Sequence, residues 1–269
     1  MAAHSPSLLI AWQLNNKNVL IVGGGEIASQ RIDSILSTPA SITLVAPLDG
    51  LSIRTTEHIV SHPDRITYHN RLFSGPDELE NIDMVLTALD DSDRTREIVN
   101  MCRAARIPVN AADIPDLCDF YFGAQIRDGP LQIMISTNGN GPRLASLIKS
   151  KVQKNLNGTE GKAILKVGTL RSMLKGRAPG VGGDVGRRRM KWMAELCNTW
   201  EMEELALLDE GMMVKLLDQG WEKDCVPTPE EIDRSLKRQG QSQQILIPSI
   251  IGIVSGALFV TCLVVARRR

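Results

Sequence analysis

Aromatic residues, unbalanced charge and paired cysteines are all scarce or absent in this chain of 269 residues. Phe, Trp and Tyr make up 4% of the sequence, which is too little for the aromatic platforms on which nucleic-acid bases stack. The 31 Lys and Arg residues equal the 31 Asp and Glu residues in number, so no net positive field attracts a polyanion. These absences argue against a nucleic-acid-binding protein.

Metal-binding and disulfide patterns are also missing. The five cysteines form no C-x-x-C pair, and the four histidines fit no metal-ligand spacing such as H-E-x-x-H. An odd number of unpaired cysteines favours a reducing compartment over a disulfide framework, and the absence of a ligand set argues against a zinc hydrolase. We therefore expect no permanent metal site.

One long apolar run lies near the C-terminus. Residues 245–266 are 22 positions without a charge, and Arg267, Arg268 and Arg269 follow directly. A helix of this length rises about 1.5 Å per residue and crosses a hydrocarbon core of about 30 Å. The N-terminus has neither a basic region nor a long apolar stretch, so no signal peptide is expected. We predict a transmembrane tail anchor at 245–266 on an intracellular membrane, with the rest facing the cytosol; a buried core helix is the alternative.

Apolar strands alternate with helical patterns in the first half of the chain. Strands are expected at 18–22, 41–47, 83–89 and 107–112, with a weaker strand or loop at 65–73. Helical spacing follows the first strand and recurs at 92–107, where Ser92 is a candidate N-cap. This alternation predicts an α/β fold with a Rossmann-like, doubly wound parallel sheet.

The pattern changes after residue 115. Two strands joined by Asp128-Gly129-Pro130 are expected within 119–137, and helices are expected at 141–156 and over 161–222. Thr228 and Glu231 have the spacing of a capping box. We predict a Rossmann domain at 1–115, a strand pair at 116–141, a helical domain at 142–240 and the tail at 245–266.

A glycine fingerprint lies between the first strand and the first helix. Gly23 permits a tight turn, Gly25 lets the backbone approach a pyrophosphate, and Ala28 allows helix and strand to pack closely. The second strand ends in "LVAPLDG" without an acidic residue at its tip, although Asp49 follows. Arg54 is the first arginine after that strand, so a 2′-phosphate has no immediate partner and NAD is favoured over NADP.

Three carboxylates follow the strand at 107–112. Asp113 comes directly after it, where ligands of open α/β sheets bind, so chemistry and a structural role are equally open for this residue. Asp116 follows Pro115 in a turn, and Asp119 is placed to hydrogen-bond backbone, so structural roles are favoured for these two.

Four segments together resemble the siroheme synthases, and most closely the fungal bifunctional precorrin-2 dehydrogenase/sirohydrochlorin ferrochelatases. They are "VGGGEIASQR", "LVAP", "NAADIPDLCDFYFGAQI" and "LQIMISTNGNGPRLASLIK", and the likeness covers about residues 8–220. The apolar tail is not part of the family pattern.

The resemblance implies oxidation of precorrin-2 to sirohydrochlorin with NAD⁺, followed by Fe²⁺ insertion that gives siroheme. It implies a homodimer formed through the strands at 119–137. Asp113 corresponds to the family's key acid and would attract the incoming Fe²⁺ transiently. Cofactor contacts carry over to Glu26, Ile27, Pro47 and Leu48, beside the fingerprint residues Gly23, Gly25 and Ala28. Because the substrate carries many carboxylates, Arg143, Lys149 and Lys151 are candidates to bind it. The alternative, that they form a solvated basic helix face without a binding role, stays equally open.

Three other functions stay open from the sequence. The protein could be a dehydrogenase that has lost iron insertion, a membrane-tethered nucleotide sensor without chemistry, or a structural adaptor. A sensor needs no base at Asp113, and an adaptor needs no glycine turn.

Overall fold

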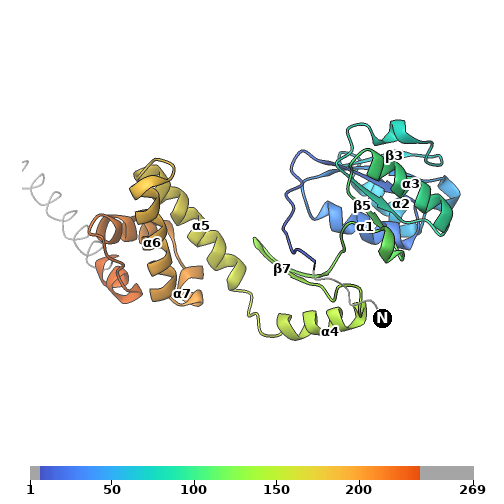
Figure 1. Ribbon diagram of the computed structural model, residues 1–269. Helices are drawn as coiled ribbons and strands as arrows, with labels where there is room; N and C mark the ends of the chain where they lie inside the picture. The colour runs from blue at the N-terminus through green and yellow to red at the C-terminus, as the bar shows by residue number, and fades with distance from the viewer. Residues whose placement is uncertain (1–6, 237–269) are drawn as a thin grey trace, which may run out of the picture. The chain divides into compact units, whose positions relative to one another are not determined.

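The computed structural model describes residues 7–236, which divide into two compact units. The first unit extends to Ala124 and includes Ile135–Leu147, and the second contains Gln125–Met134 and the chain from Ile148 onward. Each unit has its own buried core. Figure 1 labels helices and strands of both units. The domain boundaries expected from the sequence stay predictions.

The first unit is built on a five-stranded sheet. Its strands are β1 (Asn18–Val22), β2 (Ser41–Val45), β3 (Ile66–His69), β4 (Met84–Thr87) and β5 (Val109–Ala111). All neighbours pair in parallel, in the order β3-β2-β1-β4-β5. The order reverses between β1 and β4, and a crevice for ligands forms beyond the carboxyl ends of the strands at such a point. The predicted Rossmann-like sheet is therefore confirmed.

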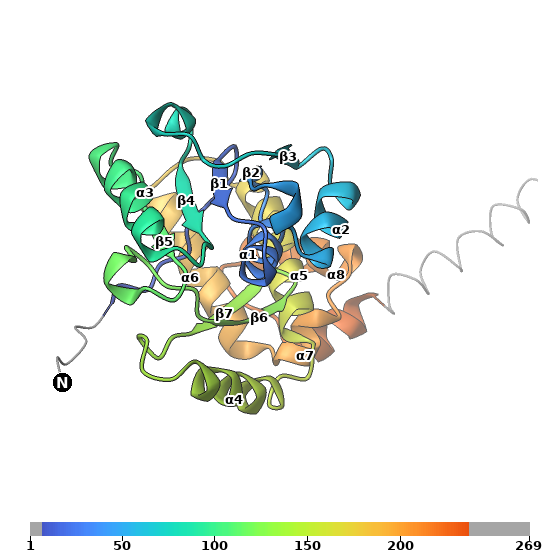
Figure 2. The same ribbon diagram turned by 90° about the vertical axis from the view of Figure 1, so that its right-hand side faces the viewer.

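Helices cover both faces of this sheet, which explains why the strands are nearly continuous apolar runs. α1 (Glu26–Leu36) packs Ala28, Ile32 and Ile35 against one face, and α3 (Ser92–Ala104) packs Ile98, Val99 and Cys102 against the other. Figure 2 shows α3 and α2 (Ile53–Ser61) on opposite sides of the strands.

The sequence pattern did not predict α2. Its β-branched residues disfavour a helix, and only Thr55 among its residues is buried, so no apolar stripe marks it. Ser52 caps the helix by accepting a hydrogen bond from the Thr55 N–H. The cap and the packing of α2 on α1 decide the conformation here.

The second unit begins with the hairpin of β6 (Ala124–Asp128) and β7 (Leu131–Ile135), which turns at Gly129 and Pro130 as expected. Helices follow: α5 (Glu160–Arg177), α6 (Gly183–Thr199), α7 (Met202–Ala206) and α8 (Glu210–Lys215). α5 begins against β6, because the Gly161 N–H donates to Asp128 Oδ2 at 2.8 Å. α4 (Pro142–Gln153) joins the units in sequence and starts at a proline, as predicted.

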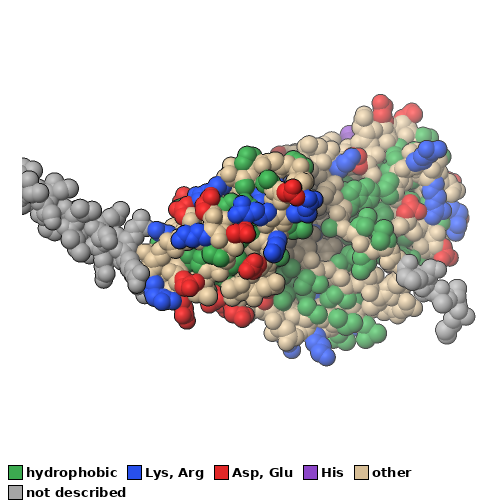
Figure 3. Space-filling view, turned by 60° about the vertical axis from the view of Figure 1, so that its left-hand side comes forward, with side chains coloured by type: hydrophobic (Ala, Val, Ile, Leu, Met, Phe, Trp, Pro, Cys, Tyr) green, Lys and Arg blue, Asp and Glu red, His purple; other side chains and the backbone are tan. Residues whose placement is uncertain are grey.

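Tryptophans organise the helical core of the second unit. Trp192 and Trp221 meet edge to face at 6.2 Å between ring centroids. Their neighbour Trp200 is buried too, and the Nε1–H groups of Trp192 and Trp200 donate to the carbonyls of Cys225 and Pro227. On the surface of this unit, basic and acidic side chains are interspersed (Figure 3), so no patch of one sign dominates the face shown.

The expected transmembrane anchor requires a correction. Among residues 7–236, no helix is long and apolar enough to cross a membrane. The stretch at 245–266, to which the prediction was attached, lies outside the described residues. The membrane-spanning helix is therefore removed from the fold assignment, and the membrane localisation that depended on it is withdrawn.

Candidate active site

Gly23 makes the turn that leaves β1, and no other residue fits there. Its φ of +112° lies in a region that side chains with a Cβ rarely adopt. A Cβ at this position would lie 2.2 Å from the Ala88 carbonyl oxygen. The Gly23 N–H donates to the Val45 carbonyl at 3.0 Å, so the turn is tied to β2 as well.

Gly25 caps α1 beside open space. No atom would lie within 4 Å of a Cβ at Gly25, and no side chain caps the first amides of the helix. Free amides at a helix N-terminus bind phosphate, and the missing Cβ lets that phosphate approach the backbone. The turn therefore fits the pyrophosphate of a dinucleotide.

Two residues of the α2 cap orient this turn, Ser52 through its backbone and Thr55 through its side chain, and sequence reasoning missed both. The Ser52 N–H donates to the Gly24 carbonyl at 2.8 Å, and the fully buried Thr55 hydroxyl lies 3.4 Å from the Gly25 carbonyl. Because a trans peptide unit points its N–H opposite to its C=O, the bond to Gly24 turns the Gly25 N–H away from α2. The Ser-x-x-Thr spacing at residues 52–55 was the available sequence signal.

The predicted contacts after the fingerprint and after β2 occupy different environments. Glu26 and Ile27 are exposed in the first turn of α1, whereas Ala28 is fully buried and serves the close packing of helix on sheet. After β2, Pro47 is half-buried, and Leu48 is exposed with its N–H held by Asn70 Oδ1 at 2.8 Å. The backbone of this loop is thus anchored to the end of β3.

Arg54 is already occupied by a carboxylate. It forms an ion pair with Asp33 of α1, and His58 Nε2 lies 3.2 Å from the other oxygen of the same carboxyl. Asp33 would therefore compete with a 2′-phosphate for this guanidinium. The pairing is consistent with the preference for NAD.

Asp113 follows β5 at the same edge of the sheet as the glycine turn. The Ala88 N–H donates to Val22 of β1, and the Ala112 N–H donates to Thr87 of β4, so the three strand ends are in register. With about 4.8 Å between strands, Asp113 lies two strands, or about 10 Å, from the glycine turn. Its side chain is exposed, and its φ of +61° is the left-handed conformation that Asp and Asn tolerate best.

The other two carboxylates of the loop differ from Asp113. Asp119 Oδ2 accepts a hydrogen bond from the Val109 N–H at 3.0 Å, and Arg103 lies 3.6 Å from Oδ1. Asp119 therefore holds the chain against β5, which is the structural role considered for it. Asp116 is exposed in a short 3₁₀ turn, and no hydrogen bond of its carboxylate is found within residues 7–236.

The candidate substrate-binding residues all lie on α4. Arg143 and Lys151 are exposed and Lys149 is half-buried. At about 100° per residue, Arg143 and Lys151 lie about 80° apart around the helix, and Lys149 points to another side. The structure does not gather the three side chains into one cluster, and their role stays a prediction.

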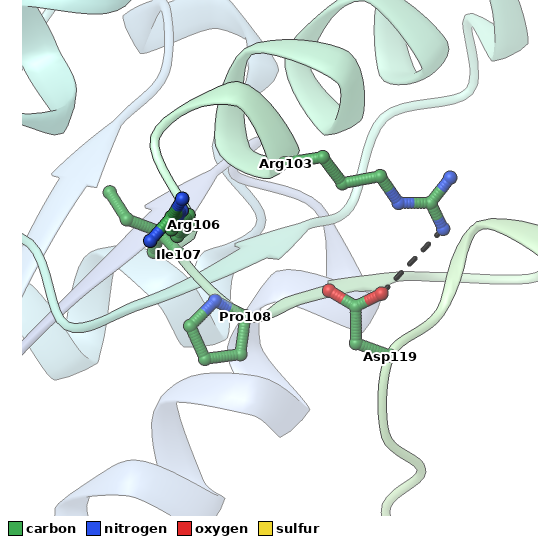
Figure 4. Close-up of a pocket in the computed structure, with 5 residues that line it drawn as sticks. All are labelled: Arg103, Arg106, Ile107, Pro108 and Asp119. Atoms are coloured by element: carbon green, nitrogen blue, oxygen red, sulfur yellow. Dashed lines mark ion pairs between the residues drawn. The ribbon is translucent and has the colours of Figure 1, made fainter.

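A shallow hollow of about 300 Å³ lies elsewhere, at the amino end of β5 (Figure 4). It is lined by Arg103, Arg106, Ile107, Pro108 and Asp119, with the Arg103–Asp119 pair on one side. This end of the strand is opposite to Asp113, so the hollow is not part of the candidate site. Among residues 7–236, no group of three or more His, Cys, Asp or Glu side chains is arranged to hold a metal ion.

Comparison with known proteins identifies the family. An NAD(P)-binding family model matches residues 10–124, and models for the central and C-terminal parts of sirohaem biosynthesis proteins match residues 128–155 and 158–227. A siroheme biosynthesis protein of Schizosaccharomyces pombe is 45% identical over 226 residues, which are 84% of this chain and 83% of the relative. The chain belongs to the siroheme biosynthesis proteins.

Two further relatives extend this assignment. A siroheme biosynthesis protein of Saccharomyces cerevisiae is 30% identical, with 78% of this chain and 89% of the relative covered. A siroheme synthase of a Psychrobacter species is 31% identical over 67% of this chain but only 35% of its own length. The chain therefore spans about a third of that bacterial siroheme synthase.

A solved structure supports the fold. SirC, a precorrin-2 dehydrogenase, superposes with a TM-score of 0.59 at 22% identity, over 80% of this chain and all of that chain. As a siroheme biosynthesis protein with an NAD(P)-binding domain at residues 10–124, the chain confirms the predicted family and cofactor class. The individual site residues stay predictions.

Proposed function

We propose that this siroheme biosynthesis protein oxidises precorrin-2 to sirohydrochlorin with NAD⁺ and then inserts Fe²⁺ to form siroheme, with Asp113 as the general base. The observation that carries the proposal is the place of Asp113, exposed at the carboxyl end of β5 and two strands from the glycine turn. Its left-handed backbone adds support, because unusual conformations of this kind cluster at functional sites.

One carboxylate suffices for both steps. Oxidation removes a hydride and a proton from precorrin-2, and NAD⁺, when bound, would supply the hydride acceptor. Asp113 accepts the proton. Iron insertion replaces two pyrrole N–H protons with Fe²⁺, and the same carboxylate accepts those protons in turn. Its oxygens attract the incoming Fe²⁺ transiently, as carboxylates do for divalent cations.

The residues of the turn fit the cofactor. Gly25, Glu26 and Ile27 would hold the pyrophosphate through the free amides of α1, and Pro47 and Leu48, where β2 ends, would contact the rest of the dinucleotide. Ser52 and Thr55 hold the turn in shape. We favour NAD over NADP because Arg54 is paired with Asp33.

The function is tested by incubating the full-length protein with precorrin-2 and NAD⁺, and by adding Fe²⁺ afterwards. We expect the absorbance spectrum to change to that of sirohydrochlorin and then to that of siroheme, with a slower first step when NADP⁺ replaces NAD⁺. If precorrin-2 is oxidised but iron is not inserted, the protein is a dehydrogenase without ferrochelatase activity. No oxidation with either cofactor would overturn the proposal.

We further propose that the protein works as a homodimer that uses α4 together with the β6–β7 hairpin. Leu144, Leu147 and Ile148 are 60%, 51% and 45% exposed, and their spacing places them on one side of α4. Exposed apolar patches of this kind mark protein–protein contacts. A second copy of the chain covers this patch in the proposed dimer.

Replacing Leu147 by Glu should dissociate the dimer, because a carboxylate would then be buried in an apolar interface. We expect light scattering after size exclusion to fall from the mass of two chains to one, with the far-ultraviolet spectrum unchanged. Gln153→Glu is the matched control, since Gln153 is exposed on the opposite side of α4. A wild-type protein that runs as a monomer at micromolar concentration would refute the dimer.

A further inference from the structure

Arg31 differs from the other arginines of the described chain. Within residues 7–236, the arginines whose side chains form neither a hydrogen bond nor an ion pair are Arg31, Arg96, Arg106, Arg143 and Arg171. The last four are exposed, so water solvates their charges. Arg31 is half-buried, and its Nε atom is buried without a partner.

The guanidinium of Arg31 lies on an aromatic shelf. It stacks over the Phe122 ring at 4.5 Å from the centroid, Phe122 contacts Phe120, and Phe120 contacts Trp12. Stacking of this kind fixes the plane of a guanidinium and removes water from one of its faces. The side chain is therefore oriented before any ligand arrives.

The surroundings of Arg31 include the loop after β5. Burial lowers the pKa of the Arg31 guanidinium; a thiolate at Cys118 would oppose that shift, and so does the Asp113 carboxylate. The Cys118 thiol itself donates to the Ala111 carbonyl at 3.0 Å, and burial raises its pKa, so Cys118 supplies no counter-ion at neutral pH. Asp113 is the nearby carboxylate, yet it forms no ion pair with Arg31.

A second unpaired group lies beside the same loop. Asn110 of β5 is buried, and its Nδ2 donates to the Phe120 carbonyl at 2.7 Å and toward Cys118 Sγ at 3.4 Å. Its Oδ1 has no partner within the described chain. Buried polar groups are nearly always paired in native proteins, so two unpaired groups around one loop indicate a place prepared for something else.

Burying part of a guanidinium without an anion beside it lowers the stability of the folded protein, and no ion pair within the described chain offsets this cost. An arriving carboxylate recovers it, because Arg binds carboxylates through charge-assisted hydrogen bonds. We propose that Arg31 binds a peripheral carboxylate of the tetrapyrrole substrate and so holds the ring against Asp113. This inference rests on the proposed function.

A carboxylate of the substrate fits this position better than a phosphate of the cofactor. The pyrophosphate is served by the amides at Gly25, whereas Arg31 lies more than one helical turn further along α1 and faces Phe122 and the loop of Asp113. The positive charge of Arg31 also offsets the repulsion between the substrate's carboxylates and Asp113. Arg31 thereby places the anionic substrate next to the anionic base.

The test compares Arg31→Met with wild type in the full-length protein. Met keeps an unbranched stem over Phe122 but removes the charge, and Arg31→Lys keeps the charge without the fork. We expect Arg31→Met to raise KM for precorrin-2 and Kd for sirohydrochlorin at least tenfold, with KM for NAD⁺ within twofold of wild type. Arg31→Lys should recover part of the affinity. Arg96→Met, which removes an exposed arginine without a partner, should leave all constants unchanged.

Stability separates a binding role from a structural one. Removal of an unpaired, partly buried charge should leave Tm unchanged or raise it, while tetrapyrrole affinity falls. Unchanged tetrapyrrole affinity in Arg31→Met would overturn the inference. A lower Tm together with an equal weakening of tetrapyrrole and NAD⁺ binding would also overturn it, because it would indicate a structural role. A selective loss of NAD⁺ affinity would assign Arg31 to the cofactor instead. Sirohydrochlorin binding is measured by the change in tryptophan fluorescence and requires no turnover. It therefore tests Arg31 even if the wild-type protein fails to oxidise precorrin-2.

Discussion

Asp113→Asn should lower the rate of precorrin-2 oxidation by about 10²–10⁴-fold, the contribution typical of a general base. Asn is chosen because it tolerates the left-handed backbone found at residue 113, whereas Ala would add strain at φ +61°. Iron insertion should slow as well, since its two protons need the same acceptor. The rates are measured from the absorbance changes of the two steps with the full-length protein.

Asp116→Asn is the matched control for this variant. Asp116 is exposed in the same loop, and its carboxylate has no hydrogen-bond partner within residues 7–236. The Asp116→Asn protein should therefore oxidise precorrin-2 and insert iron at rates within twofold of wild type. Affinity for NAD⁺ should be unaffected in both variants. If Asp113→Asn oxidises precorrin-2 at the wild-type rate, the base lies elsewhere.

Gly23→Ala should disrupt the cofactor turn and the fold together. Its Cβ would lie 2.2 Å from the Ala88 carbonyl oxygen, and its φ of +112° is strained for any side chain. Overpacking and backbone strain together should cost about 2–5 kcal/mol of the free energy of unfolding. Tm should fall by roughly 5–15 °C, and NAD⁺ binding should be lost.

Gly25→Ala separates the two effects. No atom lies within 4 Å of a Cβ there and φ is −74°, so we expect Tm to stay within about 2 °C of wild type. The new methyl group would occupy the space where the pyrophosphate approaches, so Kd for NAD⁺ should rise at least tenfold. Equal NAD⁺ affinity in Gly25→Ala and wild type would move the phosphate site away from this turn.

Several features of the fold were predictable because they depend on local pattern. The central strands β1 and β4 are buried on both faces and appear as continuous apolar runs, and the glycine fingerprint lies between a strand and a helix. The hairpin turn at Gly129 and the Thr228–Glu231 capping box also formed as predicted. In each case the residues that carry the signal are close in sequence.

Other features were not predictable from local pattern. α2 has no apolar stripe, and its role in holding Gly24 and Gly25 depends on Ser52 and Thr55 lying against a turn about 30 residues earlier. The sequence favoured a structural role for Asp119, but only the tertiary structure identified its partner, the Val109 N–H ten residues earlier. The apolar run at 245–266 suggested a membrane span, but no described helix has that character.

The sequence by itself determined the sheet, the glycine turn and the family, because all three are specified by short segments with their own periodicity or spacing. Only the tertiary structure decided which charged side chains are free. The sequence does not indicate which of Arg54 and Arg31 has a carboxylate partner. In the structure Arg54 pairs with Asp33, whereas Arg31 is partly buried over Phe122 without an anion. The physical reason is that pairing and desolvation depend on contacts between residues distant in the chain, and no local pattern specifies them.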